Sequence, residues 1–234
     1  MAGAITAVKR AFNWAADEGY IDHSPIARIK KPPRTGRGEE AYLMPDQWQK
    51  LVATVKDGQK PYEVEPFLDY ITVMKETGCR PQEIRKVEAR HLDHAAKRWV
   101  FPVEESKDGK KTKQKRIVEL GDVAYGICQK LALKHPEGPL FRNSDGKPWT
   151  NYALSCRCQR LEEKLGFEVF PYAIRHTFAT EAILNGVDVI TIARLMGHSD
   201  LAMLNRIYQH VMRDKEYMQK ARAKAIQRRA TDAA

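Results

Sequence analysis

The spacing of apolar residues predicts helices along most of this chain. Aliphatic and aromatic side chains return every three to four positions, which places them on one face of a helix. Turn signals separate these segments: Gly78 is expected to end one helix and Pro81 to open the next. The expected helices are 4–19, MPDQWQKLVATV, EVEPFLDYITVMKETG, RPQEIRKV, 122–134, 150–165, 173–185, 188–196 and the basic segment 213–229.

The pattern changes to that of strands in the middle of the chain. KRWVFPVEE and QKRIVEL carry Trp, Val, Ile and Phe on either side of the turn-rich SKDGKKTK, which predicts a β-hairpin. A further strand is expected near VEARHL. The sequence therefore predicts a mainly α protein with a small antiparallel β-sheet, in the α+β class.

A break in the helical pattern predicts a domain boundary near the N-terminus. The segment EGYIDHSPIARIKKPPRTGRGEE contains several Pro and Gly residues and many cations, which is typical of a linker. The helix before it has an apolar face that one helix cannot bury alone. We expect residues 1–38 to be the remnant of an N-terminal domain, residues 39–212 to be the main domain, and residues 213–234 to be a C-terminal basic helix and tail.

The composition adds a strong basic bias to this picture. Lys and Arg number 40 against 30 Asp and Glu, a formal net charge of +10 over 234 residues. This excess favours a polyanionic partner, most often nucleic acid, although charge alone is equally compatible with an ordinary soluble basic protein. No apolar run approaches the roughly 20 residues that cross a bilayer, and we find no signal peptide. We therefore expect a cytoplasmic protein without a membrane partner.

The sequence offers no pattern for a metal or a cofactor. Its four cysteines, Cys79, Cys128, Cys156 and Cys158, follow neither a disulfide nor a zinc spacing, and we expect free thiols. It contains no Gly-rich phosphate loop, no acidic metal cluster and no HExxH motif. We expect no metal and no cofactor, so any phosphoryl chemistry would rely on arginines to offset charge.

Four residues near helix ends form a candidate phosphoryl-transfer group. The guanidinium forks of Arg80 and Arg175 suit a phosphate and the charge of its transition state. His198 can donate to a phosphate oxygen, and Tyr208 is a candidate nucleophile if its proton is removed. Each residue alone has a structural explanation: a surface or ion-paired arginine, a packed tyrosine, or a histidine beside a helix-ending glycine. The combination favours function.

The order and spacing of four blocks, TGCRPQEI, RHTFAT, LMGHS and YQHV, resemble the catalytic domain of tyrosine recombinases of the phage integrase type. The resemblance extends over residues from about 40 to 212, and the preceding helix and linker resemble the end of that family's core-binding domain. It implies the tyrosine recombinase catalytic-domain fold. It also implies a site-specific recombinase or integrase that cleaves and rejoins DNA without a metal, through a 3′-phosphotyrosine.

The resemblance assigns a role to each matching residue. Arg80 and Arg175 correspond to the two catalytic arginines, and Glu83 corresponds to the acidic residue that supports the site. His198 occupies the His-or-Trp position, and Tyr208 corresponds to the nucleophile that attacks a DNA phosphate. The attack releases a 5′-hydroxyl, and a hydroxyl from a partner strand later reverses it.

Two positions depart from the family pattern. The family's general-acid lysine falls on Lys107 when counted from the first hairpin strand and on Lys111 when counted from the second; we favour Lys107. Alternatively, the basic run Lys107–Arg116 is only a solvated loop whose cations contact phosphates. Tyr172 stands where the family usually has a histidine, and a phenol is a poor general base near neutral pH.

The expected partner is double-stranded DNA, with a homo-tetramer on paired sites and a monomer in free solution as a compatible state. A type IB topoisomerase-like nicking and closing activity would use the same chemistry. The alternative from another class is a decayed, non-catalytic DNA-binding integrase fragment. The candidate phosphate contacts are Lys30, Lys31 and Arg34 in the linker, Lys110 and Lys111 in the hairpin, and Arg157 and Arg160 in helix 150–165.

Overall fold

The computed structural model of the chain describes residues 2–30, 42–57, 61–106, 109–198, 202–213 and 215–231. The chain divides into two compact units, Met1–Glu39 and Glu40–Ala234. The first unit contains α1 (Ala2–Asp17), whose Lys9 ammonium donates to the carbonyl oxygen of Ala27 at 2.8 Å. The identity of residues 1–38 as part of a further domain, and a boundary at residue 212, stay predictions.

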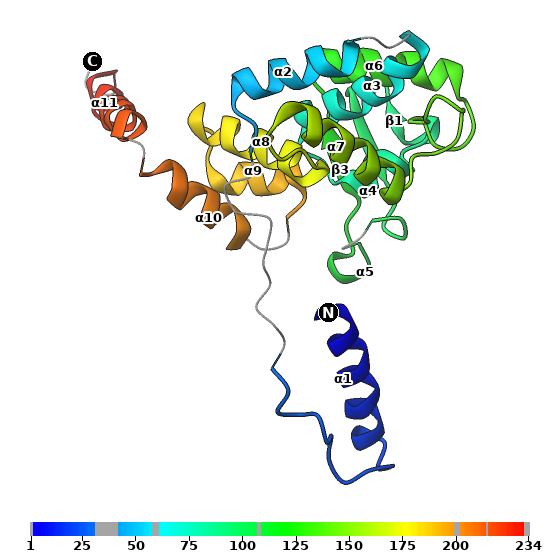
Figure 1. Cartoon of the computed structure of the whole chain (residues 1–234). Coiled ribbons are helices and arrows are strands. Elements are labelled where there is room, and N and C mark those ends of the chain that lie inside the picture. Colours follow the sequence, from blue (N-terminus) through cyan, green and yellow to red (C-terminus); the bar gives the residue numbers. More distant parts are fainter. Residues whose placement is uncertain are drawn as a thin grey trace. The chain divides into compact units, whose positions relative to one another are not determined.

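The second unit is mainly helical and contains one small antiparallel sheet in the order β1-β2-β3 (Figure 1). This architecture confirms the expected fold class. The elements in chain order are α2 (Pro45–Lys56), α3 (Pro61–Thr77), α4 (Pro81–Lys86), the 3-10 turn η1 (Ala89–His91), β1 (Leu92–Asp93), β2 (Arg98–Phe101), α5 (Gly109–Thr112), β3 (Arg116–Glu119), α6 (Asp122–Lys134), α7 (Asn151–Leu165), α8 (Pro171–Leu184), α9 (Val189–Met196), α10 (Ala202–Val211) and α11 (Lys215–Thr231).

The predicted hairpin exists, with two differences around it. β2 and β3 pair with Trp99 opposite Val118 and Phe101 opposite Arg116, and all four of these side chains are buried. The connection between the strands contains the short helix α5, where the sequence indicated only a turn. The strand expected near VEARHL is reduced to β1, because the ring of His91 accepts a bond from the backbone N–H of Glu88 and closes the turn η1.

Two hydrophobic clusters make up the interior of the second unit. The larger cluster surrounds α3, which packs against α2, α6 and α8. The smaller cluster joins the later part of α8 to α9 and α10. Helix α8 belongs to both, because Ile174 lies in the first cluster and Ala179 in the second. Arg175 therefore lies where the two clusters meet.

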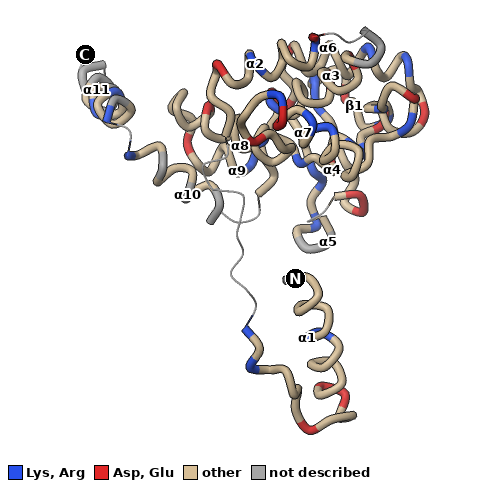
Figure 2. The backbone as a smooth tube through the Cα atoms, in the orientation of Figure 1, with Lys and Arg blue, Asp and Glu red and all other residues tan. Residues whose placement is uncertain are grey.

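Charged residues occur on many elements rather than on one. Figure 2 shows Lys and Arg in both units, interspersed with Asp and Glu (Figure 2). The excess of basic residues in the composition is therefore a property of the chain as a whole. It does not by itself locate a binding site.

Gly78 carries the tightest constraint among the helix-ending glycines. Its φ of +57° lies in the left-handed region, and a Cβ at this position would overlap the Phe178 ring. Gly166 ends α7 with a similar φ of +76°, but a Cβ there would have no neighbour within 4 Å. A comparison of substitutions at these two glycines therefore separates the cost of a left-handed backbone from the cost of steric crowding.

Gly166→Ala should lower the free energy of unfolding by about 1–2 kcal/mol, the usual cost of a left-handed backbone for a residue with Cβ. Gly78→Ala should cost about 1–3 kcal/mol more, because the new methyl group must also displace a packed ring. Urea unfolding of the two variants and the parent measures this difference. Equal losses for the two variants would contradict the crowding at Gly78.

Candidate active site

Arg80 and Glu83 are held together by the start of a helix. Arg80 precedes α4 with an extended backbone, and Pro81 is the first residue of that helix. The backbone N–H of Arg80 donates to Glu83 Oε2 at 2.8 Å, and Nη1 of Arg80 donates to Glu83 Oε1 at 3.2 Å. The guanidinium also donates through Nη2 to the carbonyl oxygen of Gly197, which directly follows α9. Arg80 thus connects α4 to the end of α9.

Arg175 is a fully buried cation with uncharged acceptors. Its side chain, on α8, is 1% exposed. Nη1 donates to the carbonyl oxygen of Gly78 at 2.5 Å, and Nη2 donates to that of Met196 at 2.9 Å. Burial lowers the pKa of Arg175 to about 10, so the guanidinium stays charged at neutral pH. Carbonyl oxygens aimed at the group compensate for the lost water.

His198 completes this cluster as an acceptor. Its Nε2 lies 2.6 Å from Nη2 of Arg175. Because a guanidinium can only donate, the ring must accept at Nε2 and carry its proton on Nδ1. Burial, followed by the positive charges of Arg175 and Arg80, lowers the pKa of His198 to about 4. The imidazole is therefore neutral at physiological pH, with one N–H donor to offer.

A cleft of about 540 Å³ opens beside these groups. Arg80, Gly197 and His198 line one part of it, and residues of the β2–β3 connection line another. Arg175 does not line the cleft itself, but it bonds to His198, which does. The described residues that line it are Arg80, Ser106, Thr112, Gln114, Lys115, Arg116, Ile117, Arg194, Gly197 and His198.

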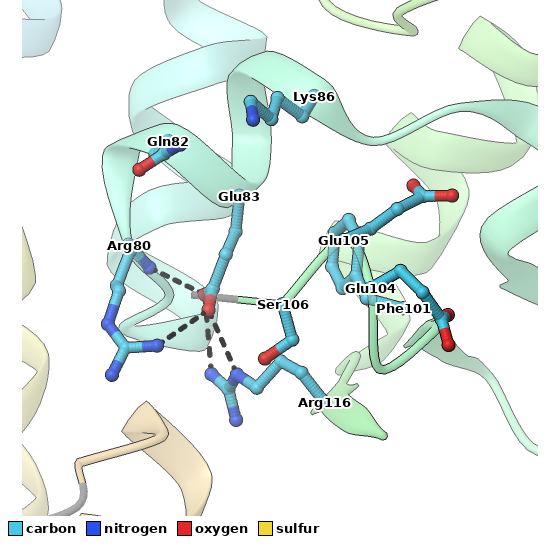
Figure 3. Close-up of a pocket in the computed structure, with 9 residues that line it drawn as sticks. All are labelled: Arg80, Gln82, Glu83, Lys86, Phe101, Glu104, Glu105, Ser106 and Arg116. Carbon is cyan, nitrogen blue, oxygen red and sulfur yellow. Dashed lines mark hydrogen bonds and ion pairs between the residues drawn. The ribbon is translucent and has the colours of Figure 1, made fainter. Parts of the chain in front are cut away.

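Arg116 is a buried cation of the site that the sequence analysis missed. It opens β3, is 8% exposed, and donates from Nε and Nη2 to the two carboxylate oxygens of Glu83 at 3.1 and 3.4 Å. Figure 3 shows Glu83 between the guanidiniums of Arg80 and Arg116, beside a smaller cavity of about 200 Å³ (Figure 3). The alternation of side chains in RIVEL indicates that Arg116 is buried, because Arg116 lies on the same face of the strand as Val118.

Tyr208 lies outside the cleft lining in this structure. Its side chain, on α10, is partly buried and packs against the cluster formed by α8, α9 and α10. The pKa of Tyr217 is raised by burial and by the nearby phenol of Tyr208, so these two tyrosines are neighbours. The structure brings the cations and the histidine together, and Tyr208 is not among the described residues that line the cleft.

The other candidate residues are placed less completely. Tyr172, at the start of α8, is 53% exposed and is not part of the cleft lining. Lys107, Lys31 and Arg34 lie outside the described residues, as do the side chains of Lys110 and Lys111 in α5. Lys30 and Arg160 are exposed. Arg157, expected to face DNA, holds its guanidinium 5.0 Å from the centre of the Phe67 ring, against the core of the domain.

Within the described part of the chain, no three His, Cys, Asp or Glu side chains gather as a metal-binding group. The described cysteines are free thiols, as the sequence indicated. None of the described helices combines the length and apolar character that crossing a membrane requires.

Sequence comparison links the chain to known recombinases. The model of a family described as the phage integrase family matches residues 41–215. The tyrosine recombinase XerA of Saccharolobus solfataricus is 29% identical over 211 residues, which cover 90% of this chain and 62% of XerA. XerD of Listeria monocytogenes is 25% identical over 218 residues, which cover 88% of this chain and 70% of XerD. The chain thus spans less than two thirds of the XerA relative.

Structural comparison gives the same fold. The Tn1549 transposon integrase, solved in complex with a circular intermediate DNA, matches with a TM-score of 0.64 and 18% identity over 88% of this chain and 73% of the integrase. The XerA recombinase matches with a TM-score of 0.59 and 21% identity over 79% of this chain and 64% of XerA. At these identities the likeness establishes the fold alone, and the fold agrees with the one that the sequence predicted.

The depressed pKa of His198 predicts a titration far from that of an ordinary histidine. In the folded protein the ring should stay neutral until the pH approaches 4, while the unfolded chain takes up the proton near pH 6.5. Because the unfolded state then binds more protons, the contribution of His198 to stability is complete above about pH 6.5 and decreases as the pH falls toward 4.

NMR titration of the His198 ring protons measures this pKa directly, with His198→Asn as the control that assigns the signal. His198→Asn should also remove part of the loss of stability between pH 6.5 and 4. A ring that titrates near pH 6.5 in the folded protein would contradict the burial and the contact with Arg175.

Proposed function

This chain belongs to the phage integrase family, and we propose that it is the catalytic part of a site-specific DNA recombinase. The reaction is cleavage and rejoining of a DNA strand through a tyrosine. The observation that carries the proposal is the joining of Arg80, Arg175 and His198 around one cleft, by bonds that connect α4, α8 and the end of α9.

The proposed reaction exchanges one phosphoester bond for another. The phenolic oxygen of Tyr208 attacks a DNA phosphorus atom and forms a 3′-phosphotyrosine, while the bond to the 5′ oxygen breaks and that oxygen leaves as a hydroxyl. Tyr208 loses one proton and the 5′ oxygen gains one, so the proton count balances. A 5′-hydroxyl from a partner strand reverses the step. The energy of the broken bond is kept in the covalent intermediate.

The cleft supplies the charge that this reaction needs. The attacked phosphate gains negative charge in the transition state, and preorganised cations stabilise that charge most when water is excluded. Arg80 lines the cleft, and Arg175 is locked in place by two backbone carbonyls. His198 offers an Nδ1–H donor because its Nε2 is occupied by Arg175. Arg80 and His198 line the cleft and are the proposed phosphate ligands, while Arg175, buried and bonded to His198, contributes its positive charge.

The β2–β3 connection is in position to supply the general acid. Ser106 and Thr112 both line the cleft, and the two candidate lysines, Lys107 and Lys111, lie between them in the chain. The described residues on either side of Lys107 and Lys111 therefore lie at the cleft. We propose that one of the two protonates the departing 5′ oxygen.

Double-stranded DNA is the proposed substrate, bound as a homo-tetramer on paired sites. The Tn1549 integrase and XerH, which share the fold, have been solved bound to DNA. Exposed cations such as Lys30 and Arg160 would contact phosphates without reading sequence. We also propose the cytoplasm as the site of action, because bacterial duplex DNA is found there.

Tyr208 must approach the cleft for cleavage to occur. Because it is not among the described residues that line the cleft, we propose that its side chain reaches the cleft by a rotation, by a shift of α10 or from a second protomer. A chain that cannot make this change would bind DNA without cutting it. A covalent intermediate therefore distinguishes the recombinase from a non-catalytic DNA-binding protein.

The protein should form a covalent adduct with a nicked suicide duplex that contains its site. Since that site is not known, a library of nicked duplexes with a randomised arm provides the probe, and adducts that survive denaturation are sequenced. Tyr208→Phe should reduce adduct formation below detection, because phenylalanine has no nucleophilic oxygen. Tyr217→Phe is the matched control, since it removes the neighbouring phenol and should retain the adduct.

Each outcome favours one candidate function. Adduct formation by Tyr208→Phe would mean that another residue attacks, and retained DNA binding without any adduct would favour the non-catalytic alternative. Adduct formation that stops with a chelator and returns with Mg²⁺ would contradict the metal-free chemistry. Relaxation of supercoiled DNA without strand exchange between two selected sites would favour topoisomerase-like nicking and closing.

A further inference from the structure

Arg116 directs its guanidinium into the protein. Beyond its two bonds to Glu83, Nη1 donates to the carbonyl oxygen of Ile117 at 2.7 Å and to that of Arg194 at 3.3 Å. These bonds connect β3 to α4 and α9. Although Arg116 lies in the wall of the cleft, all three of its guanidinium nitrogens donate to protein acceptors. It is therefore built to hold other groups rather than to bind a ligand itself.

Glu83 is the group that Arg116 holds. Both partners are largely buried, with side chains 8% and 12% exposed. The same carboxylate accepts two bonds from Arg80. Burial opposes ionisation of Glu83, but the charge and hydrogen bonds of Arg116, followed by those of Arg80, lower its pKa below the ordinary value. Glu83 is thus a buried anion that two arginines share.

The buried charges of the site have a simple balance. Arg80, Arg116 and Arg175 are cations, and Glu83 is an anion. His198 is neutral at physiological pH, because its pKa is about 4, and Cys79 is a neutral thiol, because burial raises its pKa to about 12. Among these buried groups, three guanidiniums and one carboxylate leave two net positive charges, and the exposed Lys115 and Arg194 of the cleft lining add to them.

We propose that Arg116 is a positioning residue that neutralises Glu83, so that Arg80 and Arg175 present two net positive charges to the DNA phosphate. This inference rests on the proposed strand-transfer function. A phosphodiester carries one negative charge, and its five-coordinate transition state carries a second. A site with two net positive charges matches the transition state better than the bound substrate, which is the condition for acceleration.

The position of Arg116 has a second consequence, for the lysine-bearing connection. Arg116 begins β3, directly after the connection that contains Lys107 and Lys111. Its guanidinium packs against Gly197, where a Cβ would meet Arg116 Nε at 2.6 Å. The end of the connection is therefore fixed to the residue before His198. Arg116 therefore sets the charge of the phosphate site and holds the end of the connection next to β3 against Gly197.

A charge-restoring pair of substitutions tests the proposal. Arg116→Met removes one positive charge and leaves Glu83 with Arg80 as its remaining cation, so the rate of single-turnover cleavage of a selected nicked duplex should fall roughly ten- to a hundredfold. The dissociation constant of Arg116→Met for the same duplex should change by less than about threefold, because exposed phosphate contacts remain.

In the double variant Arg116→Met/Glu83→Gln the net charge returns to its original value, and the new amide oxygen can still accept from Arg80. The double variant should therefore cleave faster than Arg116→Met.

A second readout does not depend on cleavage. Inorganic phosphate should bind to the free protein, followed through the NMR signal of His198. Its dissociation constant should rise in Arg116→Met and recover in the double variant. Arg98→Met is the matched control, because it removes another strand arginine paired with a carboxylate, Asp93, outside the cleft lining. This control should leave both readouts unchanged, and thermal unfolding establishes that each variant is folded.

The results separate the two proposals. If the double variant is as slow as Arg116→Met, or slower, and binds phosphate no better, Arg116 has only a structural role and the inference fails. If the parent protein forms no adduct, the proposed function fails, while the phosphate titrations still decide whether Arg116 sets the charge of the site. Recovery in both readouts supports the inference.

Discussion

The burial of the Arg175 guanidinium is the constraint on which the rest of the site depends. A charge removed from water is costly unless polar groups replace the lost hydration. Here the replacement comes from the carbonyl oxygens of Gly78 and Met196 and from the ring of His198. These acceptors lie at the end of α3 and at the end of α9, so one side chain on α8 is bonded to two other parts of the domain. The site is rigid because moving any of these parts would deprive a buried cation of an acceptor.

Two glycines that follow helices, Gly78 after α3 and Gly197 after α9, perform the same task. Gly78 and Gly197 both have positive φ values, and the carbonyl of each accepts a bond from a guanidinium. At each glycine, a neighbouring side chain occupies the space that a Cβ would need: the Phe178 ring in one case and the Arg116 guanidinium in the other. Helix termination and cation binding are therefore achieved by the same residue, and neither glycine can gain a side chain without disturbing both.

The electrostatics of the cleft follow from the unequal partners of its cations. Arg175 donates to two carbonyls and a neutral imidazole, whereas Arg80 and Arg116 share the carboxylate of Glu83. An exposed ion pair would contribute little, but these groups are buried, so each unit charge has a larger effect on a nearby phosphate. Lys and Arg elsewhere in the chain are spread over many elements (Figure 2), so they would contribute to long-range attraction of a polyanion rather than to the field inside the cleft.

The sequence by itself determined most of the helices and strands and indicated several candidate site residues, and the tertiary structure decided which side chains contact one another. Periodicity placed the helix 122–134 at the bounds that the structure has, and it located both hairpin strands, because these signals are local. The four family blocks identified Arg80, Arg175 and His198, which the structure brings together. The short helix α5 and the burial of Arg116 were not found. The alternation in RIVEL indicates that Arg116 faces inward, but its partner Glu83 is 33 residues away in the chain, and no local pattern predicts a pairing over that distance. The same reason applies to Tyr208. The block YQHV indicated Tyr208 as the candidate nucleophile, but the position of this side chain relative to the cleft depends on how α10 packs against α8 and α9.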